Sequence, residues 1–268
     1  MRHRIAAGIV ACTVLAIPVA ATAASYPDRG QLNAVRNYLE QRGGVVGVGV
    51  IDNHGHVRGV HDRRRFFSAS VIKAMLLVSY LRKVDYQDRR LTSYERSRLR
   101  PMIRVSSNDA ATWVYQRVGK PSLRRLAQRA EMDEFSICCT SWTYAMFSAR
   151  DQAKFFWQLE RLTPPRFRDY ALDLLRSIVP RQSWGIPRVG RPLGASVFFK
   201  GGWRGTGIGR LVHQASFIRY RGTGFSLAIL TDGNPSKSYG IATIAGVARR
   251  ILCVKPSRSA ATVPPSAG

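Results

Sequence analysis

Acidic residues are scarce in this chain of 268 residues: 16 Asp and Glu face 42 Lys and Arg, and the formal net charge is +26. Such an excess of cations is one feature of nucleic-acid-binding proteins. Here the basic residues are scattered along the chain, and they form no basic arm and no RNA motif interleaved with aromatic residues. We therefore expect no nucleic-acid partner, and an exported protein of this charge is expected to meet an anionic wall polymer or lipid.

Cysteine and histidine are also scarce, with four and five residues. The C-x-x-C and H-x-x-x-H spacings of common metal sites are absent, so we expect neither a metal nor a cofactor. After a predicted signal segment, Cys138, Cys139 and Cys253 remain, and a disulfide from Cys253 to either of the other two stays open. His54 and His56 flank Gly55 in a sequence typical of a solvated turn.

An apolar run from Ile5 to Ala20 follows two arginines and ends in the small residues Ala21–Ala23. This arrangement is typical of a secretory signal peptide with an A-x-A cleavage site. We predict that residues 1–23 are such a peptide and that the protein is secreted or associated with the cell envelope. An uncleaved anchor is the alternative, because the run is just long enough to span a bilayer.

The two ends of the remaining chain carry strand patterns, and the middle carries helix patterns. We expect helices over Gln31–Arg42 and Tyr239–Cys253, a hairpin over Val45–Ile51 and Val57–Val60, and strands over Ala195–Phe199, Leu211–Tyr220 and Phe225–Leu230. From Ser70 to about Ile178 we expect helices alone. Capping boxes begin two of them, at Thr92-x-x-Glu95 and Ser148-x-x-Asp151, and Pro164-Pro165 opens another.

This order predicts an α/β (α+β) fold, in which one antiparallel sheet flanked by helices is built from both termini and an all-helical subdomain is inserted. We assign residues 24–67 and 183–256 to the α/β subdomain and 68–182 to the helical subdomain. Residues 257–268 are expected to form a disordered tail. A hydrophobic content of 45% is sufficient for a sizeable core.

The first candidate site is Ser70-Val71-Ile72-Lys73, at the start of a helix that is apolar nearly all round. A lysine three residues after a serine can reach its hydroxyl and remove the proton. Burial and the positive end of the helix dipole both favour the uncharged amine that a general base requires. The alternative is structural, with Ser70 as a helix cap and Lys73 on the surface.

The second candidate site is Ser106-Ser107-Asn108, between two helical stretches. As a functional site, Ser106 relays a proton between Lys73 and the leaving nitrogen, and the Asn108 amide holds the substrate. As a structural site, the same residues are an ordinary helix cap.

The third candidate site is Lys200-Gly201-Gly202-Trp203, where we expect a strand to end. Glycines let a substrate backbone lie along the strand, and Lys200 offers a positive charge to a carboxylate. The backbone N–H groups of Ser70 and Trp203 would form the oxyanion hole. The structural alternative is a bulge or turn.

Together these sites resemble the set S-x-x-K, S-D-N and K-T-G of class A β-lactamases and penicillin-binding proteins, in the same order and with similarly wide spacing. The resemblance covers most of the chain after residue 23. It is most specific for secreted actinobacterial β-lactamase-like serine hydrolases, whose third motif also departs from K-T-G. It implies their α/β plus all-helical architecture and an acyl-enzyme on Ser70.

Two departures from the family pattern concern the substrate chemistry. Gly201 replaces a threonine whose hydroxyl grips the substrate carboxylate in the family, and Thr206 or Arg204 could substitute for it. The family's omega loop also carries a glutamate that activates the deacylating water, whereas residues 135–150 contain no Glu or Asp. The nearest acids, Glu131, Asp133 and Glu134, come too early.

The sequence therefore predicts an active-site-serine hydrolase that acts on β-lactam amide bonds. The alternatives are a D,D-peptidase or amidase acting on peptidoglycan peptides, and a penicillin-binding protein that hydrolyses its acyl-enzyme slowly because it lacks the glutamate. A catalytically silent protein that only holds a wall fragment is a further alternative. We expect no obligate protein partner.

Overall fold

The computed structural model describes residues 25–138 and 140–253. The predicted signal peptide at 1–23, the predicted tail at 257–268 and Cys139 lie outside these residues. Within them, no helix has the length and apolar character needed to cross a bilayer. Cys138 and Cys253 are both exposed, and no disulfide joins these two.

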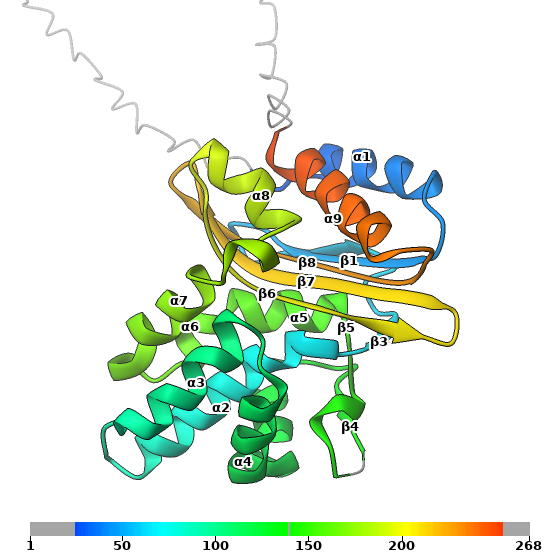
Figure 1. Ribbon diagram of the computed structural model, residues 1–268. Coiled ribbons are helices and arrows are strands. Elements are labelled where there is room, and N and C mark those ends of the chain that lie inside the picture. Colours follow the sequence, from blue (N-terminus) through cyan, green and yellow to red (C-terminus); the bar gives the residue numbers. More distant parts are fainter. Residues whose placement is uncertain (1–24, 139, 254–268) are drawn as a thin grey trace, which may run out of the picture.

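A five-stranded antiparallel sheet is the centre of the fold (Figure 1). Its strand order is β2-β1-β8-β7-β6. The strands are β1 (Val45–Ile51), β2 (Val57–Val60), β6 (Ser196–Thr206), β7 (Gly209–Tyr220) and β8 (Thr223–Asn234). The first two come from the N-terminal part of the chain and the other three from the C-terminal part, so the predicted sheet built from both ends is confirmed.

Helices cover both faces of this sheet (Figure 1). One face carries α1 (Arg29–Glu40), α8 (Ile186–Gly190) and α9 (Lys237–Leu252). The other carries α5 (Ala149–Trp157), with α2 (Lys73–Tyr86), α3 (Ser93–Arg104), α4 (Asn108–Arg129), α6 (Leu159–Leu162) and α7 (Arg168–Arg176) beyond it. The predicted α/β fold with an inserted run of helices is therefore confirmed, while the subdomain boundaries stay predictions.

Local sequence rules explain several helix starts. Thr92 and Ser148 cap α3 and α5, and in both cases the reciprocal bonds of the predicted capping box are present. Pro164 caps a short 3₁₀ turn, Pro165–Phe167, that leads into α7, and the fixed φ of Pro165 suits its first position.

The expectation of helices alone in the middle of the chain is wrong in one respect. Three short strands, β3 (Arg65–Phe67), β4 (Ser136–Ile137) and β5 (Ala145–Ser148), form a second small sheet of order β3-β5-β4. Strands of two to four residues are too short to show a period in the sequence, and they form because the segment before Ser70 pairs with the segment before α5.

The third strand prediction is also corrected, since β6 does not end at Lys200. It continues through Gly201 and Gly202, which pair with Gln214 and His213, and ends at Thr206. Because β6 is the edge strand of the sheet, two glycines weaken it without interrupting a central ladder.

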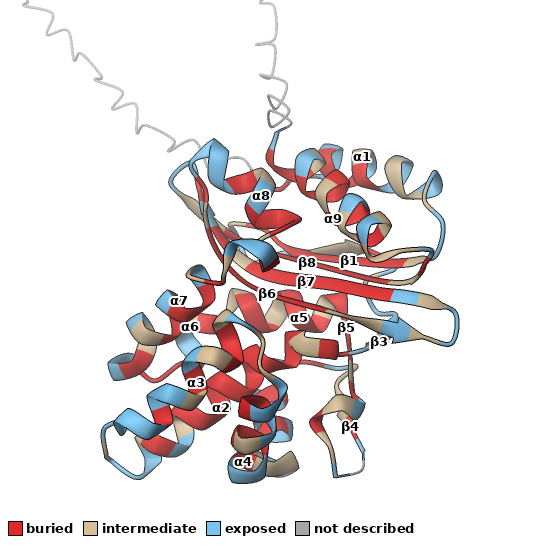
Figure 2. Ribbon diagram, in the orientation of Figure 1, coloured by how far each residue is buried: buried red, intermediate tan, exposed pale blue. Residues whose placement is uncertain are grey.

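Helix α2 is the most completely buried helix segment next to the candidate site (Figure 2). Its residues Ala74–Val78 are fully buried. A helix that is apolar on every side must be covered on every side, and α3, α4 and α7 supply that cover. The start of α2, where Lys73 lies, is therefore held in the interior.

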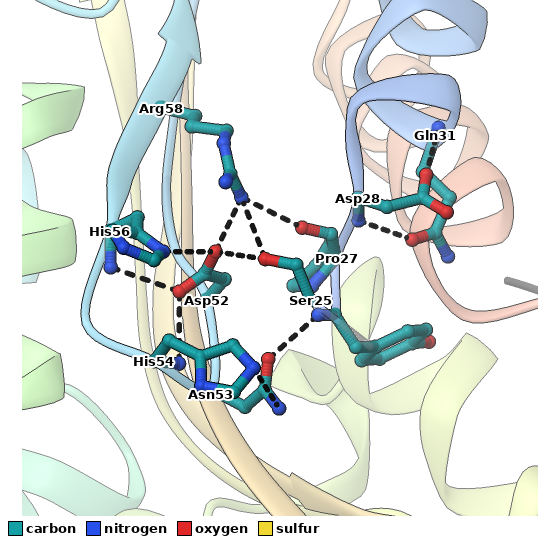
Figure 3. Close-up of polar contacts among 10 residues, drawn as sticks. Ser25, Pro27, Asp28, Gln31, Asp52, Asn53, His54, His56 and Arg58 are labelled. Atoms are coloured by element: carbon teal, nitrogen blue, oxygen red, sulfur yellow. Dashed lines mark hydrogen bonds and ion pairs between the residues drawn. The ribbon is translucent and has the colours of Figure 1, made fainter. Parts of the chain in front are cut away.

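A buried carboxylate fastens the N-terminal segment to the β1–β2 turn (Figure 3). Asp52 is fully buried, pairs with Arg58 and accepts a hydrogen bond from Ser25 Oγ. The backbone N–H groups of His54 and His56 also donate to it, each over 2.9 Å. Burial alone would raise the pKa of Asp52, but these hydrogen bonds outweigh it and lower the pKa to about 2.

We predict that Asp52→Asn lowers the free energy of unfolding near neutral pH by about 2 kcal/mol. Because the folded-state pKa lies below the ordinary value of 3.8, this stabilisation is complete above about pH 4 and is lost as the pH falls toward 2. Urea unfolding of wild type and variant across this range measures it. Asp169→Asn, at an exposed carboxylate, is the control. If the difference in free energy of unfolding between wild type and Asp52→Asn stays constant with pH, the lowered pKa of Asp52 is contradicted.

Candidate active site

Ser70 lies in a single 3₁₀ turn, Ala69–Ile72, between β3 and α2. Ala69, immediately before it, has a φ of 41°, and Ser106 has a φ of 60°. Residues other than glycine rarely adopt such angles, and where they persist the surrounding structure holds them, often at functional sites. One predicted site thus contains a strained backbone residue, and another directly follows one.

Lys73 is fully buried, and its Nζ lies among acceptors from the loop before α4. It donates to Ser106 O over 2.6 Å and to Asn108 Oδ1 over 2.8 Å, and Ser106 Oγ is 3.2 Å away. Burial lowers the pKa of Lys73 to about 7. A neutral amine has two N–H groups and one lone pair. In the neutral form the two shorter bonds use both N–H groups, and the lone pair is left as an acceptor with Ser106 Oγ 3.2 Å away.

Ser70 itself is half-buried, and its Oγ forms no hydrogen bond with Lys73 in the described part of the chain. The direct contact expected from the S-x-x-K spacing is therefore not formed in this structure. Catalytic hydrogen bonds often tighten only when substrate is present. Ser70 O accepts from the backbone N–H of Lys73, so the two residues are adjacent in the same turn.

Lys200 and Lys73 are connected through one hydroxyl. Lys200 Nζ donates to Ser106 Oγ over 3.1 Å and to Gly201 O over 2.8 Å. Burial lowers the pKa of Lys200 well below its ordinary value, and the nearby Lys73 lowers it further. The structure thus brings Lys73, Ser106, Asn108 and Lys200 into one cluster.

Gly202 brings strand β6 against the backbone of Ser70. A Cβ at Gly202 would lie 2.7 Å from Ser70 N and 3.0 Å from Ala69 Cβ, which is too close for a side chain. Only glycine therefore lets β6 approach the Ser70 N–H, and Trp203 follows as the next residue. This is the arrangement needed for an oxyanion hole built from Ser70 and Trp203.

Aromatic side chains occupy the surroundings of Gly201. A Cβ there would lie 3.3 Å from the indole of Trp184, a buried residue whose Nε1 has no hydrogen-bond partner. Trp184 and Trp203 meet edge to face, with ring centroids 6.0 Å apart, and Lys237 Nζ lies 4.0 Å from the Trp203 ring centre. The missing threonine of the third motif is thus replaced by an aromatic wall.

The two predicted substitutes for that threonine differ in their availability. Thr206 donates to Asp232 Oδ1 over 2.8 Å at the far end of β6, which makes it unsuitable. Arg204 lies with its guanidinium 4.5 Å from the ring centre of Phe67, three residues before Ser70, and its buried Nε is unpaired. Arg204 is the better placed of the two.

Two of the three acids that precede the predicted omega loop form ion pairs away from Lys73. Asp133 pairs with Lys154 over 2.9 Å, and Glu134 pairs with Arg63 over 3.3 Å. Lys73 contacts no carboxylate within the described residues. Its neighbour is instead the indole of Trp142, whose ring centre lies 5.1 Å from Nζ.

Sequence reasoning missed three residues at this site: Trp142, Trp184 and His213. His213 is fully buried, accepts from the Thr231 N–H at Nδ1 and lies with Nε2 3.0 Å from Phe67 O. Burial lowers its pKa to about 4, so it is neutral and Nε2–H donates to Phe67. Its place opposite Gly202 follows from strand register, which the spacing of the sequence alone does not reveal. Trp142 carried one signal, as a large aromatic residue among small polar ones.

Comparisons with known proteins concern the family and the fold of the chain. The model of the Beta-lactamase enzyme family matches residues 95–254, which include the second and third sites and begin after Ser70 and Lys73. No curated protein sequence matches the chain.

Solved structures show the same fold at low identity. A β-lactamase from Sphaerobacter thermophilus is 20% identical with a TM-score of 0.71, over 83% of this chain and 95% of that one. A class A β-lactamase from Mycobacterium abscessus is 18% identical with a TM-score of 0.70, over 83% and 98%. The structure of PBP-A is 19% identical with a TM-score of 0.71, over 84% and 95%.

We predict that Gly202→Ala slows modification of Ser70 by a penicillin about 100-fold, because the new methyl group displaces the Ser70 N–H. Mass spectrometry of the intact protein measures the rate. Gly205→Ala on the same strand is the matched control, since a Cβ there makes only an ordinary contact of 3.5 Å. Equal rates in the two variants would contradict the placement of the oxyanion hole at this position.

Proposed function

Because the chain belongs to the β-lactamase enzyme family, we propose that it is an active-site-serine hydrolase that opens β-lactam amide bonds through an acyl-enzyme on Ser70. The observation that carries this proposal is the buried amine of Lys73. Its pKa is lowered to about 7, and its two N–H groups are engaged by Ser106 O and Asn108 Oδ1. An amine held in this way is a general base at neutral pH.

In the acylation step, Lys73 accepts the proton of Ser70 Oγ as the oxygen attacks the carbonyl carbon of the amide. The backbone N–H groups of Ser70 and Trp203 stabilise the negative charge that develops on the carbonyl oxygen. When the C–N bond breaks, Ser106 gives its proton to the leaving nitrogen and takes one from Lys73. The contact of 3.2 Å between Ser106 Oγ and Lys73 Nζ supports this relay.

The charge of the site favours a substrate with a carboxylate. Lys73 and Lys200 share Ser106, and no acid of the described chain contacts either of them. Protonating both of these neighbouring amines is electrostatically unfavourable. An anion bound beside them lowers the free-energy cost of protonating either one. Penicillins and peptides that end in D-alanine both carry a carboxylate next to the amide that reacts.

Deacylation is the slower half of the proposed reaction. Attack of water on the ester of Ser70 requires a base, and the indole of Trp142 beside Lys73 cannot serve as one. Lys73 remains the available base for this step. We therefore propose acylation followed by slow release.

A second candidate is a D,D-peptidase or amidase that acts on peptidoglycan peptides, or a penicillin-binding protein. The neighbourhood of Lys73, which contains Trp142 and no carboxylate, favours it specifically. Under either candidate we propose that the protein is exported through residues 1–23 and that it works in the cell envelope.

We predict that incubation with benzylpenicillin adds one penicilloyl group to wild type and none to Ser70→Ala, and that the adduct persists for longer than it took to form. Intact-mass spectrometry over time follows both steps. Sustained turnover of a chromogenic cephalosporin selects β-lactam hydrolysis. One equivalent followed by a halt selects the second candidate, and no adduct at all contradicts the proposed nucleophile.

We also predict that the acylation rate rises as the pH increases through about 7, because the uncharged form of Lys73 is the base. Below that pH the rate falls about tenfold per unit. Lys73→Ala loses at least about 100-fold at every pH, whereas Lys120→Ala, which removes a lysine outside the site, retains the wild-type profile. A pH-independent rate in wild type would contradict the role of Lys73.

A further inference from the structure

A cavity of about 500 Å³ lies between α2 and the second half of α4. It is separate from the candidate active site, since Lys73 lies at the start of α2 and the cavity is lined by the stretch from Ser79 to Tyr86. The two helices pack side by side in the helical block (Figure 1). Its basic lining residues are Arg82, Lys83, Arg117, Arg125 and Arg129.

The spacing of these residues places them on two facing helix surfaces. Ser79, Arg82, Lys83 and Tyr86 follow one another at intervals that keep them on one face of α2. Ser122, Arg125, Leu126 and Arg129 repeat the same intervals on α4. A kink at Gly119, whose φ is 66°, separates this part of α4 from the part that carries Asn108.

No acidic residue lines the cavity. The nearest carboxylate on α2, Asp85, pairs with Arg166 over 2.7 Å. Burial lowers the pKa of Arg82 and the charge of Arg129 lowers it further, while the nearby Asp85 partly offsets this. Unpaired like charges are unfavourable unless an anion joins them.

Hydrogen bonds orient the cations without neutralising them. Arg82 Nη1 donates to Leu162 O over 2.9 Å, and Lys83 Nζ donates to Arg117 O over 2.8 Å. A carbonyl holds a guanidinium or ammonium in place but leaves its full charge available. The remaining N–H groups of Arg82 are therefore held ready for a ligand.

We propose that this cavity binds a small ligand that carries two or more phosphate groups. Guanidinium groups match phosphate oxygens in a bidentate manner, and five cations exceed what a single carboxylate needs. The volume is in the range of small-molecule pockets.

The test is calorimetric titration of the purified protein with tripolyphosphate at fixed salt. The double variant Arg125→Gln/Arg129→Gln removes two exposed charges from the cavity, and Arg188→Gln/Arg249→Gln removes two exposed charges elsewhere. We expect affinity to fall about tenfold or more in the first and to change less than about twofold in the second. Equal losses would show that only net charge matters and would overturn the proposal.

A further measurement defines the ligand. Citrate, a tricarboxylate, is expected to bind at least about tenfold more weakly than tripolyphosphate, and equal binding would overturn the phosphate assignment. Penicillin modification of Ser70 stays at the wild-type rate in all these variants, since the two sites are separate.

Discussion

The burial of Lys73 without a counter-ion is the constraint on which the site depends. An ammonium in this position would need carboxylates or water, and it has three neutral acceptors and an indole instead. Burial therefore lowers the pKa of Lys73 to about 7, and the uncharged form becomes available at neutral pH. That form requires the start of α2 to remain covered, which links the reactivity of Lys73 to the packing of the helical block around it.

The sheet contributes as much to the site as the helices do. Edge strand β6 delivers Lys200 to Ser106, and the absence of a side chain at Gly202 lets the strand touch the Ser70 backbone. On the neighbouring strand, neutral His213 joins Thr231 to Phe67 and so fixes the segment that enters the strained turn at Ala69. Chain segments more than a hundred residues apart thus determine where the serine lies.

The scarcity of acids affects the molecule in two ways. The buried acids are committed to structure: Asp52 fastens the N-terminal segment, Glu95 and Asp151 complete helix caps, and none of them reaches Lys73. Trp142 lies beside the proposed base, and its indole cannot activate the water that deacylation requires. Elsewhere, arginines on α2 and α4 face one another without carboxylates, and this leaves a cavity whose charge matches a phosphate-bearing ligand.

Much of the fold and the identity of the candidate residues could be predicted from the sequence, because they are encoded in local patterns. These patterns are the capping boxes, the β1–β2 hairpin and the three short motifs that contain Ser70, Ser106 and Lys200. What the sequence could not determine depends on contacts between distant segments. The passage of β6 through Gly201 and Gly202 is decided by pairing with β7, and the place of Trp142 beside Lys73 by how its loop packs. A lowered pKa of Lys73 was expected from its helix, but the three acceptors around its Nζ belong to Ser106 and Asn108 and are brought there only in the folded chain.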